Sequence, residues 1–339
     1  MRAVTDLART PSPIAATAGG LPGGAGAPDA PAAPGFARPQ DVPARLDAAA
    51  LTVALEAGRP AGERGQLHVD GLACPTLSAG AGRALLCVHG LGHDAWDWAP
   101  LFVRCSNTAH LTAFDLPGFG LADKPARRYD LELLVQALLA AARLVAARDG
   151  GAPVVVASSL GGHVALLAAL REPALFAHLL LSAPGGLVEA STPLQAMLRA
   201  YYSVESIVGR SDGEIVGNSR RIFAQPGLAI DDALAARKLA VHRSTEARAF
   251  AVPFAGIVDD VFHHVVIDRL PALRVPCTVV SGARDVVVPP AACAEGARRL
   301  GARYVSLPEV GHCPHLEAPD RFAELVRATL APGGPDVSR

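Results

Sequence analysis

The apolar residues of this 339-residue chain form short continuous runs that alternate with longer stretches of helical periodicity. The runs carry few charges and end at Gly, Asp or Ser, as strands do in a sheet that is buried on both faces. The pattern predicts strands at 66–69, 73–77, 84–88, 111–114, 153–157, 178–182, 277–281 and 304–307.

Between these runs, apolar residues recur at the three- and four-residue spacing of helices that cover a sheet. The predicted helices are 131–147, 160–170, 290–300 and 319–330. Asp70-Gly71 separates the first two strands and is a hairpin signal. The regular alternation of strand and helix predicts an α/β fold: a mostly parallel central sheet of about eight strands, flanked by helices.

One segment, 185–270, breaks this alternation because it contains no convincing strand. It holds three helical-looking stretches at 194–202, 231–243 and 262–270. We therefore expect a helical lid inserted between two parts of one core, with the first part at 46–184 and the second at 271–332.

The N-terminal 45 residues have a different composition. Of the 33 residues from Pro11 to Pro43, 23 are Pro, Gly or Ala. Such a segment buries too little apolar surface to offset its ordering entropy, so we expect a disordered tail at 1–45. A short helix is predicted at 46–57, and residues 333–339 are expected to be a flexible C-terminus.

Charge and cysteine content exclude several classes of protein. The chain has 31 Lys and Arg against 32 Asp and Glu, which gives no basic footprint for nucleic acid. Residues 151–170 carry no charge, but serines and glycines interrupt them, so we expect a buried strand and helix and no membrane span. The six cysteines lack zinc-site spacing, and no secretory signal is visible. We expect free thiols, no metal or other cofactor, and a cytoplasmic protein.

The strongest chemical signal lies where the run 153–157 passes directly into a helix through Ser158, Ser159 and Leu160. Small residues two positions either side of Ser159, namely Ala157 and Gly161, would let strand and helix approach closely. This is the mechanical requirement of a nucleophile elbow, with Ser159 as nucleophile. An ordinary strand–helix turn is the alternative interpretation of this segment.

A nucleophilic serine needs a base, and the base needs a carboxylate that orients it. Asp285 follows the predicted strand 277–281, and His312 follows the strand 304–307. Both would lie at the carboxyl edge of the sheet, where ligands bind in α/β folds. The chain order Ser159, Asp285, His312 is that of α/β-hydrolases. Glu189 is a second candidate for the acid, but no comparable motif surrounds it.

Several motifs together resemble those of lid-containing serine esterases of the α/β-hydrolase family, over about 66–330. They are the oxyanion-loop sequence 89–92 (HGLG), the loop sequence 115–125 (DLPGFGLADKP), the acid loop 282–289 and the histidine loop 311–319. The resemblance implies a Ser159–His312–Asp285 triad, with the oxyanion held by the backbone N–H groups of Leu91 and Leu160. It also implies structural roles for His89, Asp115 and Glu317.

The sequence also suggests which residues line a substrate pocket: His93, Trp96, Ser158, Met197 and Tyr201. Arg210, Arg220 and Arg221 are candidates to bind a substrate carboxylate, although exposed arginines are usually only solvated. Cys313 is either a reactive thiol or, as we expect, a buried neighbour of His312.

The expected function is hydrolysis of a carboxylic ester through an acyl-enzyme, on a small-molecule acyl substrate. Haloalkane dehalogenases and epoxide hydrolases that this fold resembles have an aspartate at the position of Ser159. The serine at this position therefore argues against both of these activities. A C–C bond hydrolase of a ring-cleavage product, an acyltransferase and a non-catalytic binding module remain as alternatives. The sequence leaves the oligomeric state open.

Overall fold

The computed structural model describes residues 62–225 and 229–331. The expected tail at 1–45, the helix at 46–57 and the C-terminal residues 333–339 lie outside the described residues.

The chain begins with the predicted hairpin. Strands β1 (Glu63–Val69) and β2 (Leu72–Gly80) pair antiparallel, with Val69 opposite Leu72. The two turn residues have positive φ, 48° at Asp70 and 75° at Gly71. Asp and Gly tolerate this left-handed conformation, and its twist matches that of the paired strands. The hairpin prediction is confirmed.

All eight predicted strands are present in one sheet of order β1-β2-β4-β3-β5-β6-β7-β8. The pairs β1·β2 and β2·β4 are antiparallel, and the remaining five pairs are parallel. The other strands are β3 (Arg83–Val88), β4 (Ala109–Phe114), β5 (Val154–Ser158), β6 (His178–Ser182), β7 (Cys277–Gly282) and β8 (Arg303–Leu307). Every residue of β5, β6 and β7 is buried, which explains their unbroken apolar runs.

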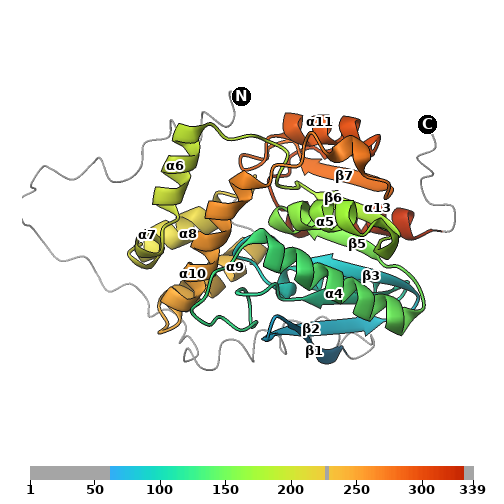
Figure 1. The fold of residues 1–339 in the computed structure, drawn as a ribbon, viewed down its shortest axis with the longest axis horizontal. Coiled ribbons are helices and arrows are strands. Elements are labelled where there is room, and N and C mark those ends of the chain that lie inside the picture. Colours follow the sequence, from blue (N-terminus) through green and yellow to red (C-terminus); the bar gives the residue numbers. More distant parts are fainter. Residues whose placement is uncertain (1–61, 226–228, 332–339) are drawn as a thin grey trace, which may run out of the picture.

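Helices cover both faces of the sheet. On one face, α4 (Leu131–Asp149), α5 (Leu160–Arg171) and α11 (Pro290–Leu300) pack against alternate strand residues such as Leu86 and Val155. On the other face, α3 (Ala99–Cys105) and α13 (Pro319–Leu330) pack against the intervening ones, such as Leu85 and Val156. The predicted α/β architecture is therefore confirmed (Figure 1).

Among the described residues, five helices separate β6 from β7 and gather beyond one end of the strands (Figure 1). They are α6 (Thr192–Tyr201), α7 (Val204–Val208), α8 (Asp212–Arg220), α9 (Ala229–His242) and α10 (Ala247–Asp260). Two of the three predicted helical stretches correspond to α6 and α9.

The third stretch, 262–270, was predicted wrongly. It contains only the ends of two short 3₁₀ turns, η5 (Val261–His263) and η6 (Leu270–Ala272). The helix instead precedes it, as α10, which contains Pro253 in its interior. Proline removes a backbone donor and usually ends a helix, so the local sequence argued against α10. Burial of Ile257 and Ala251 fully inside the protein stabilises it there.

The remaining short elements lie at both edges of the sheet, with η4 leading into the start of β6. They are the 3₁₀ turns η3 (Ala95–Trp98) and η4 (Pro173–Leu175), and the helix α12 (Pro314–Glu317). No helix of the described chain is both long and apolar enough to cross a bilayer.

Candidate active site

Ser159 occupies a strained turn between β5 and α5. Its backbone has φ 52° and ψ −115°, a conformation that residues with a side chain rarely adopt. The turn is held on both sides: Ser159 N–H donates to Ser182 O at 2.9 Å, and Ser159 O accepts from the N–H of Gly185 at 2.9 Å. Strain held this way is typical of a residue whose side chain must project from the strand end.

The two glycines at 161 and 162 permit this turn, because neighbouring residues occupy the space that a side chain at either position would need. A Cβ at Gly161 would lie 2.6 Å from the carbonyl oxygens of Val88 and His89, and one at Gly162 would lie 2.7 Å from Pro184 Cβ. Neither neighbour can retreat without moving the sheet or its loops. On the strand side, Ala157 is fully buried, so its methyl group fits where the common motif has glycine.

His312 and Asp285 form a buried pair at the ends of β8 and β7. The distance from His312 Nδ1 to Asp285 Oδ2 is 2.9 Å, and the two residues are 5% and 6% exposed. The other oxygen, Oδ1, accepts the N–H groups of Val287 and Val288 at 2.7 and 3.0 Å. Because the aspartate is fixed on both oxygens, it holds the imidazole with Nδ1 as donor and leaves Nε2 available as a base.

Glu189, the alternative acid, is not part of this pair. It borders a separate small hollow together with Gln195 and His263.

Ser159 and His312 border one cavity of about 720 Å³, which lies between the sheet edge and the inserted helices. The loop 90–92 borders it as well, and a Cβ at Gly90 would lie 3.3 Å from Ser159 Cβ. Leu91 therefore lies beside Ser159. Leu160 begins α5, where the first N–H groups of a helix have no acceptor within it.

The predicted pocket residues divide into two groups. His93, Trp96 and Ser158 line the cavity, whereas Met197 and Tyr201 do not. Met197 is 38% exposed, and the Tyr201 hydroxyl donates to Asn218 Oδ1 at 3.1 Å. The sequence placed these two residues wrongly because it could not show which face of α6 turns toward the cavity.

Most of the cavity wall is apolar. The larger apolar lining residues are Leu91, Trp96, Leu121, Tyr202, Ile207, Ile215, Ile222, Val241, Phe250, Phe254 and Val287. Apart from Leu91, Trp96, Leu121 and Val287, they all come from the segment between β6 and β7. The inserted helices therefore shape the space above Ser159.

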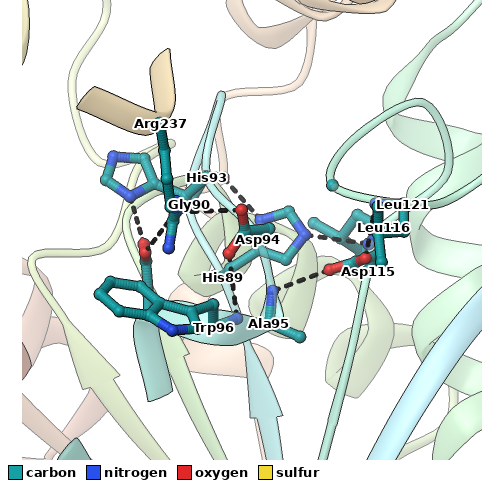
Figure 2. A network of polar contacts seen from close by, with 12 residues as sticks. His89, Gly90, His93, Asp94, Ala95, Trp96, Asp115, Leu116, Leu121 and Arg237 are labelled. Atoms are coloured by element: carbon teal, nitrogen blue, oxygen red, sulfur yellow. Dashed lines mark hydrogen bonds and ion pairs between the residues drawn. The ribbon is translucent and has the colours of Figure 1, made fainter. Parts of the chain in front are cut away.

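His89 and Asp115 organise the loops around this space (Figure 2). Leu116 N–H donates to His89 Nε2 at 2.9 Å, and His89 Nδ1 donates to Gly90 O at 2.8 Å. Asp115 accepts the N–H groups of Ala95 and Leu121 at 2.8 and 2.7 Å. Burial, together with the nearby charge of Asp94, raises the pKa of Asp115 to about 7.

Glu317 organises the histidine loop in the same manner. Its carboxylate accepts the N–H groups of Ala224, Gly311 and Cys313 at 2.8 to 3.0 Å. Cys313 is buried, and this burial raises the pKa of its thiol well above its usual value. The thiol is therefore protonated at neutral pH and a poor nucleophile.

A charged cluster beside the loop 89–92 was not predicted. Arg237 of α9 is 8% exposed and donates to Asp97 Oδ1 at 3.1 Å, and its distance to Asp94 Oδ2 is 3.0 Å (Figure 2). Asp97 also binds His93 Nδ1. Burial alone would raise the pKa of Asp97, but His93 and then Arg237 lower it far below its ordinary value. In the sequence, Arg237 and its neighbour Lys238 look like an ordinary solvated helix face, so no signal could have found this cluster.

Metal ligands do not gather in this part of the protein: within 62–225 and 229–331, no three His, Cys, Asp or Glu side chains are placed to hold a metal ion. All six cysteines are buried, and none forms a disulfide.

Comparison with known proteins assigns the family. The model of the alpha/beta hydrolase family matches residues 85–325. The chain is 29% identical over 272 residues to the pimeloyl-(acyl-carrier protein) methyl ester esterase of Xanthomonas campestris pv. campestris, covering 78% of this chain and 99% of the esterase. It is 27% identical to the 2-hydroxymuconate semialdehyde hydrolase of Pseudomonas putida, covering 80% of this chain and 92% of that enzyme.

A solved structure of a thermophilic esterase from Thermogutta terrifontis has the same fold, with a TM-score of 0.68 at 22% identity over 79% of this chain and 98% of that one. The chain therefore belongs to the alpha/beta hydrolase family. The two relatives from Xanthomonas campestris and Pseudomonas putida are both hydrolases.

Proposed function

We propose that this protein hydrolyses carboxylic esters of small acyl compounds through an acyl-enzyme on Ser159. The observation that carries the proposal is the His312–Asp285 pair at 2.9 Å, whose His312 borders the same cavity as the strained Ser159. The similarity to a methyl ester esterase over most of both chains supports it.

In the proposed reaction, Ser159 Oγ attacks the acyl carbonyl while His312 Nε2 takes its proton. His312 then returns the proton to the leaving alcohol, and a water molecule repeats the sequence to release the acid. Asp285 keeps Nδ1 protonated and stabilises the imidazolium. The backbone N–H groups of Leu91 and Leu160 stabilise the oxyanion, a contribution worth about 10²–10³ in rate for each donor.

The segment 185–270 acts as the lid in this proposal, because its side chains make most of the apolar wall. We further propose that 46–184 and 271–332 form the two parts of one catalytic core. Buried free thiols suit a reducing compartment such as the cytoplasm.

The test compares wild type with Ser159→Ala on p-nitrophenyl butyrate. We expect burst kinetics in the wild type, and loss of at least about 10³-fold in kcat for the variant. Ser158→Ala is a matched control, since it removes a neighbouring hydroxyl but not the proposed nucleophile. Equal kcat for wild type and Ser159→Ala would refute the proposal.

C–C bond hydrolysis is the second candidate, favoured by the similarity to 2-hydroxymuconate semialdehyde hydrolase. The discriminating assay follows the loss of the yellow colour of a ring-cleavage dienoate. A kcat/KM on the dienoate that exceeds the value on the ester would favour this reaction over ester hydrolysis.

A further inference from the structure

Lys238 is a cation in the cavity wall that has no partner among the described residues. It follows Arg237 on α9 and borders the cavity that contains Ser159 and His312. No hydrogen bond or ion pair within 4.0 Å holds its ammonium group in the part of the chain that the structure describes. Lys124, the other lysine of the chain, differs because it donates to the carbonyls of Gly120 and Ala122.

The carboxylates nearest to Lys238 are engaged elsewhere. Arg237 binds both Asp94 and Asp97, and His93 takes the remaining oxygen of Asp97. Burial lowers the pKa of Lys238, and the charge of Asp97 only partly opposes this. The partly buried ammonium therefore borders the cavity without a direct counter-charge, and an anion bound in the cavity would supply one.

Lys238 also interacts electrostatically with residues beside the proposed nucleophile and its base. Its charge acts on His93 and on Cys313, the residue after His312. The His93 ring is close to Ser159: a Cβ at Gly90 would lie 3.9 Å from His93 Cδ2 and 3.3 Å from Ser159 Cβ. An anion held by Lys238 is therefore bound in the same cavity as Ser159 and His312.

The arginines that the sequence suggested for binding a substrate carboxylate are less suited to this role than Lys238. Arg210 borders the cavity, but its guanidinium stacks on Tyr201 at 4.5 Å and donates to the carbonyl of Tyr201 at 2.7 Å. Arg220 pairs with Asp232 at the surface. Glu246 borders the cavity too, and its charge acts on Lys124 and not on Lys238.

We propose that Lys238 binds a carboxylate of the substrate, so that the enzyme prefers an ester with an apolar body and one carboxylate group. This inference rests on the proposed ester hydrolysis. A monoanion matches a single unpaired ammonium, whereas a phosphate dianion would bring excess negative charge toward Asp94 and Asp97. The apolar wall formed by Phe250 and Phe254 accommodates the remainder of the substrate.

The experiment compares mono-p-nitrophenyl glutarate with p-nitrophenyl pentanoate, which differ in the carboxylate at the end of the acyl chain. A second pair, 3-carboxyphenyl pentanoate and phenyl pentanoate, carries the carboxylate on the leaving group. The readout is the ratio of kcat/KM within each pair for wild type, Lys238→Met and Lys238→Arg. A misfolded variant lowers both members of a pair together, so the ratio reports only on recognition of the anion.

We expect wild type to favour the anionic member of at least one pair by about 10- to 100-fold, the value of a buried charge-assisted hydrogen bond. Lys238→Met should bring that ratio near one, and Lys238→Arg should restore most of it. Arg298→Met, which removes a positive charge from the exposed face of α11, is the matched control and should leave the ratio at its wild-type value.

Equal constants for both members of both pairs in the wild type would overturn the role of Lys238 while leaving ester hydrolysis intact. A ratio that Lys238→Met does not change would overturn it as well. Absence of hydrolysis of all four esters by wild type would instead refute the proposed function itself.

Discussion

Gly161 is the position where a single methyl group should separate the two parts of the proposed oxyanion hole. Its Cβ position is 2.6 Å from the backbone oxygens of Val88 and His89, and real Cβ atoms essentially never approach a neighbour more closely than 3.0 Å. In Gly161→Ala, α5 and the loop that begins at His89 must therefore move apart by at least 0.4 Å. One side of this gap carries Leu160, and the other carries Leu91.

The expected loss follows from that displacement. A misplacement of about 1 Å in an active site costs about 10²-fold, so a shift of roughly half that size should lower kcat by about 10-fold or more. Overpacking a site of this kind also costs about 1–3 kcal/mol of unfolding free energy. The assays are kcat on p-nitrophenyl butyrate and urea unfolding followed by circular dichroism.

Gly217→Ala is the matched control, because Gly217 lies within α8 and a Cβ there meets nothing within 4 Å. It should keep wild-type kcat and gain about 0.5–1 kcal/mol in stability. Wild-type kcat and wild-type stability in Gly161→Ala would refute the reasoning, since the contact would then have relaxed without consequence.

Three further predictions concern Asp285, His163 and Arg237. Asp285→Asn should lower kcat by about 10⁴-fold, as expected when an imidazole is held in the wrong tautomer, and kcat within 10-fold of wild type would contradict the proposed triad. Burial lowers the pKa of His163 to about 4, so the folded protein resists protonation there and unfolding free energy should fall as pH drops from about 6.5 toward 4, at about 1.4 kcal/mol per pH unit. His163→Gln should flatten this slope in urea titrations at several pH values, and an unchanged slope would count against it. Arg237→Met leaves the buried Asp97 without its cation and should cost about 3–5 kcal/mol in urea unfolding, against less than about 1 kcal/mol for Arg298→Met at the surface; equal costs would contradict this.

The strands and the loops that follow them could be predicted because their signals are local. The strand β5 is buried along its whole length, which favours the apolar run 154–157 whatever lies around it. The glycines at 161 and 162 likewise mark a backbone approach that no other residue allows. Asp285 and His312 follow consecutive parallel strands, so sheet topology alone brings them to one edge.

The inserted helices were predicted less well because their packing depends on surfaces far away in the sequence. The helix α10 contains Pro253, which local propensity disfavours, and tertiary burial overrides that preference. Met197 and Tyr201 were predicted to line the pocket as apolar residues of the inserted segment, but of these neighbours it is Tyr202 that borders the cavity.

The sequence by itself determined the α/β architecture and the order of the motifs, because burial between two layers of helices and tight backbone turns each restrict residue type at single positions. Only the tertiary structure decided that Arg237 is buried against two aspartates and that Lys238 faces the cavity. Charged residues on a helix have the same local pattern whether they meet water or a distant loop. Their environment is therefore set by how α9 docks onto the core.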